Sequence, residues 1–356
     1  MFLKTLSPSK CALALSASLL MPLMAEVEVI AGSPVTEAVN EPFSVDFDAK
    51  GDLYGVEFTK SNRVFKLSGK KLTFVAGINH NTEKVKHVDQ HDGKDPMKAA
   101  FHGMHDIRIT GGKAILADSF NHTIRTLDLA SGEVATIAGT PGKAGFGGDG
   151  GPATAASFNI TMTGTLSPDG KRLYIADIGN HRVREIDLAA GTVKTVAGNG
   201  RKGNPADGTD ALQAPLGDAR AVTQAEDGTL YVLLRGGNSL VEVKGGKVRT
   251  VVNATGKKGY GGDGGDGREA LMNGPKYVAM DKGTVLICDT ENHCVRRYFP
   301  ETGKIELVAG TPGKANNEVG KTLLETGLRR PHGVRIGPDG KLYIADTYNN
   351  RVLRVK

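Results

Sequence analysis

Short runs of alternating apolar and polar residues follow one another along most of this chain. Turns rich in Gly, Asp and Asn separate them, as in "RLYIADIGNHRVREI" at residues 172–186. Alternation with a period of two is typical of half-buried β-strands. The chain of 356 residues also contains 48 glycines and 15 prolines, which favours many turns over long helices. The pattern therefore predicts an all-β protein.

One unit of this pattern recurs. The clear copies place an Asp-x-x-Asn segment between two alternating strands, at residues 114–127, 172–186, 285–298 and 341–355. Two weaker copies lie at 52–67 and 229–243. An apolar run precedes each copy, and most copies are followed by a short strand such as "TVKTVAG" (192–198). Four short strands per unit, repeated at about 57 residues, predict sheets arranged around an axis.

These copies resemble the NHL-repeat family over essentially all of the chain after residue 25. The resemblance implies a six-bladed β-propeller of four-stranded blades, formed by a single domain at residues 26–356. The last copy ends at "NNRVLRVK" without an outer strand, whereas "VEVIAG" (27–32) has the ending of an outer strand. We expect this N-terminal strand to complete the C-terminal blade and to close the ring.

Residues 1–25 have the layout of a signal peptide. Lys4 and Lys10 precede an apolar run from Cys11 to about Leu23, and Ala25 precedes a polar segment. The apolar run is short for a membrane span, although an uncleaved anchor is the alternative. We therefore expect an exported protein, periplasmic or extracellular, without stable membrane insertion.

The charge of the chain is modest. Loss of residues 1–25 lowers the formal charge from +6 to about +4, and no block of consecutive basic residues remains. Nucleic acid is therefore not an expected partner. Cys288 and Cys294 remain close in sequence, and they form either a disulfide across a hairpin or two free thiols.

The repeated Asp-x-x-Asn segments are interpreted as structural. Asp and Asn side chains hydrogen-bond turn backbone, and Arg182 and Arg351 are expected to tie neighbouring blades. A catalytic group is needed once per molecule, not in most blades.

Two glycine-rich segments, 145–153 and 259–267, join one blade to the next and are expected at the channel mouth. Asp263 and Asp266 offer oxygens to calcium, but their spacing departs from that of a hand-type loop.

The first strand of each propeller blade lines the central channel, so equivalent residues form a ring. Alignment of the copies on His332 gives the ring Phe43, His105, Met162, Arg220, Lys276 and His332. The following positions are Ser44, Asp106, Thr163, Ala221, Tyr277 and Gly333. Four ring residues are basic or imidazole, and burying them costs free energy unless water, an anion or a metal compensates. The ring is therefore predicted to be a ligand-binding mouth made by His105, Asp106, Arg220, Lys276, Tyr277 and His332.

The segments "MHDI" and "PHGV" also resemble the histidine motifs of peptidylglycine α-amidating lyase. That resemblance implies zinc held by three histidines from alternate blades, with His105 and His332 as two metal ligands. The third position holds Arg220, which departs from the motif, so His102 or a histidine of loop 78–93 would have to complete the site. Alternatively, Arg220 and Lys276 hold a carboxylate or phosphate beside the histidines, or the histidines hydrogen-bond loop backbone.

Two functions follow from this ring. The first is a monomeric binding module that receives a protein, a peptide, a glycan or an anionic small molecule. The second is a lyase or hydrolase that depends on zinc or calcium, with Arg220 or Tyr277 as the catalytic group. A lactonase-like variant would use Glu41, but convincing Asn or Asp partners are missing.

Overall fold

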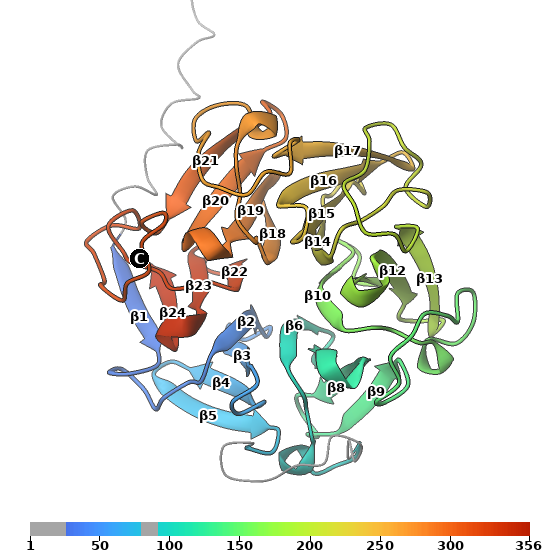
Figure 1. The fold of residues 1–356 in the computed structure, drawn as a ribbon. Helices are drawn as coiled ribbons and strands as arrows, with labels where there is room; N and C mark the ends of the chain where they lie inside the picture. The colour runs from blue at the N-terminus through green and yellow to red at the C-terminus, as the bar shows by residue number, and fades with distance from the viewer. Residues whose placement is uncertain (1–25, 80–91) are drawn as a thin grey trace, which may run out of the picture.

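The computed structural model describes residues 26–79 and 92–356 (Figure 1). In these ranges strands dominate, and the helical segments are short 3-10 turns. The all-β prediction is confirmed. The predicted signal peptide and the histidines of loop 78–93 lie outside the described residues. Within the described ranges, no helix is long and apolar enough to cross a membrane.

In the described ranges the strands form four sheets of four strands and one sheet of eight. We use the word blade for each run of four neighbouring antiparallel strands, whether or not it shares a sheet with another run. Three blades are β2 (Pro42–Phe47), β3 (Leu53–Glu57), β4 (Val64–Ser68) and β5 (Lys71–Ala76); β6 (Met104–Thr110), β7 (Lys113–Asp118), β8 (Thr123–Asp128) and β9 (Val134–Ala138); and β10 (Thr161–Leu166), β11 (Arg172–Asp177), β12 (Arg182–Asp187) and β13 (Thr192–Ala197). The others are β14 (Ala219–Gln224), β15 (Leu230–Leu234), β16 (Ser239–Lys244) and β17 (Lys247–Val252); β18 (Tyr277–Asp281), β19 (Thr284–Asp289), β20 (Cys294–Phe299) and β21 (Lys304–Ala309); and β22 (Gly333–Ile336), β23 (Leu342–Asp346), β24 (Arg351–Val355) and β1 (Val27–Ala31).

The blades surround a central axis and give a β-propeller. Figure 1 shows the first strand of each blade nearest the axis and the last strand at the circumference. The β10–β13 and β14–β17 blades are joined into an eight-stranded sheet through one parallel pair, Thr163 with Ala221. This arrangement brings the first strands, which are far apart in sequence, around one channel.

The N-terminal strand closes the ring as predicted. β1 pairs antiparallel with β24, with Val27 opposite Val355 and Glu28 opposite Arg354. The guanidinium of Arg354 also forms an ion pair with Glu28. The two ends of the described chain are therefore joined in one blade.

The core lies between neighbouring blades. Val56 of β3 and Leu116 of β7 belong to one buried cluster, and Leu233 of β15 and Ile287 of β19 belong to another. Strand residues alternate between the two faces of a sheet, so each blade contributes apolar side chains to both neighbours. Apolar packing between blades holds the first strands in place around the axis.

The Asp-x-x-Asn segments form tight 3-10 turns directly after four of the second strands, namely η2 (Ser119–Asn121), η4 (Ile178–Asn180), η6 (Thr290–Asn292) and η7 (Thr347–Asn349). In η2, Asp118 accepts hydrogen bonds from the backbone N–H of His102 and from the amide of Asn121. Burial raises the pKa of Asp118 to about 6. The structural interpretation of these residues is confirmed.

Arginines further along the third strands tie these turns to the connecting loops. Arg184 contacts Asp177 of its own turn at 3.4 Å and Asp149 of the incoming loop at 2.7 Å. Arg351 likewise contacts the loop that leads into its own blade, through the carbonyl oxygens of Asn317 and Gly327. Arg182 instead donates to Asn180 of its own turn.

The glycine-rich segments do not gather at the mouth. Gly150 donates to the carbonyl of Val193 in β13, and Gly264 donates to Ile305 in β21. They therefore cover the outer strands, where unpaired backbone groups would otherwise be exposed. Asp263 pairs with Arg296 at 2.8 Å, and Asp266 caps the 3-10 turn η5 (Gly267–Glu269). These contacts engage both carboxylates that were considered for calcium.

Two further 3-10 turns complete the described elements, η1 (Pro96–Lys98) and η3 (Ala153–Ala155). Cys288 and Cys294 are buried free thiols. Cys288 lies opposite Val295 in the β19–β20 pair, whereas Cys294 lies opposite Asp289. Directly opposite residues share a face and successive residues alternate, so the two thiols lie on opposite faces of the sheet. That placement is incompatible with a disulfide between them.

Candidate functional site

The predicted ring is set up by β-bulges at the start of the first strands. The register shifts between Met104 and Asp106 in β6, and equivalent shifts occur in β2 and β14. A bulge inserts one extra residue and interrupts the alternation of side chains. The inserted residues are Phe43, His105 and Arg220. The bulges thus place consecutive residues, such as His105 and Asp106, on the channel side.

Lys276 and His332 occupy the matching positions in two other blades. The backbone N–H of Lys276 donates to the carbonyl of Cys288 at 3.0 Å, and that of His332 donates to Ala345 at 3.2 Å. Each residue lies directly before the first strand of its blade. The structure therefore brings both to the same end of the channel as the bulge residues.

His105 and His332 lie beside one aromatic ring. Phe43 stacks on the His332 imidazole with the ring centroids 4.1 Å apart, and it meets His105 edge to face at 5.0 Å. Phe58 covers the other face of Phe43 at 4.2 Å. The two histidines, 227 positions apart in sequence, therefore share one side of the mouth.

Backbone carbonyls fix the protonation of both histidines. Nδ1 of His105 lies 2.7 Å from the carbonyl oxygen of Gly103, and Nδ1 of His332 lies 2.7 Å from that of Arg330. A carbonyl oxygen only accepts, so each Nδ1 carries the proton that it donates. Burial, with the nearby charges of Arg220 and Lys276, holds the pKa of both imidazoles well below the usual range. Each neutral ring therefore presents Nε2 as an acceptor.

The opposite side of the mouth is cationic. Arg220 is 3% exposed, and among the described residues its guanidinium makes one long hydrogen bond of 3.5 Å to Thr163 Oγ1. Within residues 26–79 and 92–356, no carboxylate lies within ion-pair distance of this guanidinium. Desolvation, followed by repulsion from Arg235, lowers the pKa of Arg220.

Lys276 is also buried, but it has a partner. Its ammonium lies 2.6 Å from Glu291 Oε1, and the same carboxylate binds Arg330. Desolvation lowers the pKa of Lys276 to about 8, against the opposing effect of Glu291. Glu291 is shared between two cations, so the charge of the mouth remains positive.

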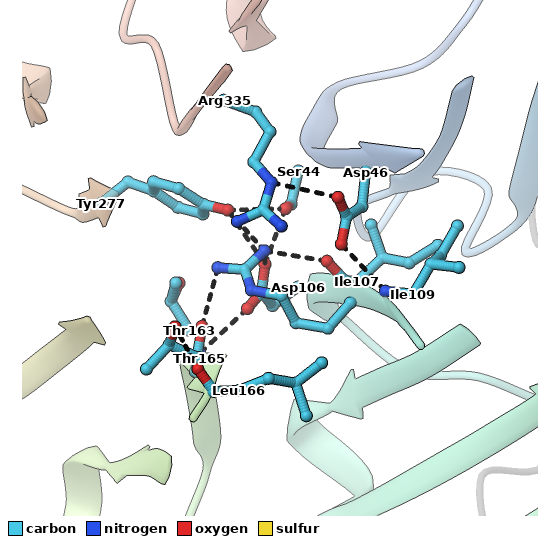
Figure 2. A network of polar contacts seen from close by, with 12 residues as sticks. Ser44, Asp46, Asp106, Ile107, Ile109, Thr163, Thr165, Leu166, Tyr277 and Arg335 are labelled. Atoms are coloured by element: carbon cyan, nitrogen blue, oxygen red, sulfur yellow. Dashed lines mark hydrogen bonds and ion pairs between the residues drawn. The ribbon is translucent and has the colours of Figure 1, made fainter. Parts of the chain in front are cut away.

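A buried network fills the axis beneath this ring (Figure 2). Asp106 accepts hydrogen bonds from Ser44 Oγ at 2.6 Å, from Arg108 at 2.9 Å and from the N–H of Gly164 at 2.9 Å. Tyr277 contacts the same group, with its hydroxyl 2.8 Å from Arg108. First strands from four blades are therefore linked across the axis.

The network extends further through a second ion pair. Arg335 donates to Asp46 at 3.0 Å, and Asp46 accepts the backbone N–H of Ile109 at 2.9 Å. Figure 2 shows Arg335 between Asp46 and the group formed by Ser44, Asp106 and Tyr277. The mouth therefore ends on a layer of paired polar side chains.

Asp106 and Tyr277 belong to this network and not to the ring itself. Tyr277 is 1% exposed, and burial raises its pKa to about 12. A phenol with that pKa stays protonated and hydrogen-bonded at neutral pH. The arrangement favours a structural role for Tyr277 over the transfer of a proton to a ligand.

The described residues do not fit a zinc or calcium site. They contain no group of three or more His, Cys, Asp or Glu side chains placed to hold a metal ion. The third ring position of the zinc motif is the guanidinium of Arg220, which does not act as a ligand. The backbone N–H of His102 donates to Asp118, and its ring meets Phe120 at 5.2 Å. His105 and His332 thus lie together as expected, but with cations as neighbours.

Sequence analysis missed the rim above the ring. Phe58, Phe120 and Tyr348 are half-buried and contact the ring histidines or Phe43. Phe120, Glu291 and Tyr348 each stand two residues after the Asp of an Asp-x-x-Asn turn. Comparison of this turn position between copies, as was done for the strands, would have identified them.

The repeats of this chain are similar to those of known proteins. The NHL repeat matches at residues 272–298 and 328–354. Protein SUPPRESSOR OF QUENCHING 1 of Arabidopsis thaliana is 28% identical over 270 residues, which is 72% of this chain and 25% of the relative. NHL repeat-containing protein 2 of Bos taurus is 26% identical over 286 residues, covering 72% of this chain and 39% of the relative. The chain thus spans well under half the length of these curated relatives.

A solved structure shows the same fold. An auxiliary nutrient-binding protein from Bacteroides thetaiotaomicron superposes with a TM-score of 0.64 at 14% identity, over 93% of this chain and 76% of the other. At this identity the similarity concerns the fold alone.

Proposed function

Because this chain belongs to the NHL-repeat family, we propose that it is an exported ligand-binding module whose channel mouth receives an anionic group, a carboxylate or a phosphate. Export rests on the signal-like residues 1–25. The nutrient-binding description of the Bacteroides propeller agrees with this class of function.

We also infer that the ring has six blades. The β10–β13 and β14–β17 units share only the single parallel pair Thr163–Ala221, whereas strands within each unit pair along their length. Counting these units as two blades gives each clear or weak copy of the repeat its own blade. The ring of six aligned residues depends on this count.

The observation that carries the proposal is the unpaired guanidinium of Arg220. A buried charge is costly unless it is paired and hydrogen-bonded, and this one has only a long contact to a threonine hydroxyl. Arg220 retains 3% exposure, and neither Nε nor its second terminal nitrogen is fully enclosed. An anion would satisfy this guanidinium with charge-assisted hydrogen bonds.

Lys276 supplies a second cation to the same ring. Its charge influences both His105 and His332, as does that of Arg220. Planar bidentate recognition by arginine and a point charge from lysine are together suited to a carboxylate or phosphate. The donor set favours binding of an anion over a metal-dependent lyase or hydrolase.

The test is calorimetric titration of the purified protein with citrate and with inorganic phosphate, at low salt. We expect at least one anion to bind, and Arg220→Gln to weaken that binding by about tenfold or more. Arg249→Gln on the outer strand β17 is the matched control, because the Arg249 side chain is 60% exposed. Equal binding by wild type and Arg220→Gln would overturn the proposal, as would failure of every acid tested to bind.

A further inference from the structure

The mouth offers three kinds of contact to a ligand. Arg220 and Lys276 provide cationic donors on one side. His105 and His332 provide the second kind, and an aromatic rim provides the third. Their combination restricts the ligand more closely than charge alone.

The histidines contribute acceptors. Their Nδ1 protons are donated to the carbonyls of Gly103 and Arg330, which leaves the lone pair of each Nε2. No side chain or backbone group in the described ranges is recorded as a hydrogen-bond partner of either Nε2. The two histidines retain 5% and 4% exposure, and neither Nε2 is fully enclosed.

These acceptors select against a ligand that carries only an anion. A simple carboxylate without hydroxyl groups has no proton to donate to Nε2 at neutral pH, and its apolar part would leave the two acceptors buried and unsatisfied. Such a loss weakens binding about fivefold or more for each group. Hydroxyl groups on the ligand would satisfy both.

The aromatic rim contributes an apolar surface. Phe58 and Phe120 are half-buried, with ring centroids 6.0 Å apart, and both pack edge to face on His105. The rim therefore adjoins the acceptors. A ligand that satisfies all three contacts has an anionic group, several hydroxyls and a C–H face.

We propose that the ligand is an acidic sugar, with its carboxylate on Arg220 and Lys276, its hydroxyls donating to Nε2 of His105 and His332, and its C–H face on Phe58 and Phe120. This inference rests on the proposed anion-binding function and assigns the ligand class for the same site. A neutral sugar leaves Arg220 unpaired, and a simple carboxylate leaves the imidazoles unpaired.

Matched probes separate these requirements. D-galacturonate, D-glucuronate and D-mannuronate carry both the charge and the hydroxyls, cyclohexanecarboxylate carries only the charge, and D-galactose carries only the hydroxyls. We expect at least one uronate to bind at least about tenfold more tightly than cyclohexanecarboxylate, and galactose to bind more weakly still.

His332→Phe is the matched variant, because phenylalanine preserves an aromatic ring against Phe43 and removes the acceptor. It should weaken uronate binding about fivefold or more and leave cyclohexanecarboxylate binding unchanged. An unchanged melting temperature would show that the variant folds, and His332→Gln, which restores an acceptor, should recover part of the affinity.

The outcomes are distinct for the two proposals. Equal affinity for uronates and cyclohexanecarboxylate, or binding of citrate or phosphate with no binding of any uronate, would overturn the acidic-sugar assignment and leave the anion-binding function standing. Failure of every acid, including citrate and phosphate, would overturn both.

Discussion

Nδ1 of His122 accepts the backbone N–H of Ile160 at 3.0 Å, and this contact ties the turn of one blade to the first strand of the next. Equivalent contacts recur around the ring. The acceptor and donor pairs are His181 with Asp218, His293 with Arg330, Asn238 with Gly274, Asn350 with Glu41 and Asn62 with Gly103. Histidine and asparagine therefore perform the same task, but only histidine titrates near neutral pH.

The first prediction concerns acid stability. Desolvation lowers the pKa of His122 and His293 in the folded protein. The unfolded chain therefore binds protons first as the pH falls below about 6.5, and stability present above that pH is lost. We expect the double variant His122→Asn/His293→Asn to lose less free energy of unfolding than wild type between pH 7.5 and pH 5.

Denaturant titrations at several pH values measure this difference. Asn tolerates the left-handed backbone of these positions, as Asn62 and Asn350 show, so the variant should match wild type closely at pH 7.5. If the free energy of unfolding fell by the same amount in both proteins as the pH was lowered, His122 and His293 would not be responsible for the loss of stability.

The second prediction concerns the stability cost of Arg220. Replacing this unpaired buried guanidinium with an apolar side chain should remove a desolvation penalty. We expect Arg220→Met to raise the free energy of unfolding of the ligand-free protein by about 1–3 kcal/mol, and to abolish anion binding.

Arg184→Met is the matched control, because Arg184 is equally buried but paired with Asp149 and Asp177. Its loss should lower the free energy of unfolding by about 3–5 kcal/mol. If the free energy of unfolding fell by a similar amount in Arg220→Met and Arg184→Met, the charge of Arg220 would have to be compensated in the ligand-free protein.

The third prediction concerns ring closure. Deletion of residues 26–32 removes β1, exposes the edge of β24 and uncovers the apolar packing made by Val27 and Ala31. We expect a loss of at least about 3 kcal/mol in the free energy of unfolding. Glu28→Gln, which removes only the half-exposed ion pair with Arg354, should cost less than about 1 kcal/mol. A melting temperature unchanged by the deletion would contradict this role of β1.

The fourth prediction concerns the pH dependence of binding. The pKa of Lys276 is lowered to about 8, so the ammonium loses its proton as the pH rises through that value. Binding of citrate should therefore weaken between pH 7 and pH 9, whereas Lys276→Met should bind more weakly with a flatter profile. Calorimetry at constant ionic strength tests both expectations. If citrate affinity depended on pH in the same way for wild type and Lys276→Met, Lys276 would be ruled out as the titrating group.

The repeated pattern predicted much of the fold. Strand alternation and the recurring Asp-x-x-Asn turn gave the strands, and the shared ending of residues 27–32 gave the closing strand. These features are local, because a repeat must carry its own turn and its own buried face. The glycine-rich segments were predicted at the channel mouth, and this prediction was wrong because they lie against the outer strands β13 and β21. Their position depends on backbone hydrogen bonds between residues distant in sequence.

The sequence by itself also determined which residues differ at equivalent positions, so His105, Arg220, Lys276 and His332 were identified as one ring. Only the tertiary structure decided how they act. Bulges turned His105 and Arg220 to the channel, Arg220 was left without a counter-ion among the described residues, and the carbonyls of Gly103 and Arg330 fixed the imidazole protons. The tertiary structure also showed that Asp106 and Tyr277 belong to the buried hydrogen-bond network beneath the ring. The physical reason is that alignment specifies a position along a strand, whereas charge pairing and protonation depend on neighbours from other blades.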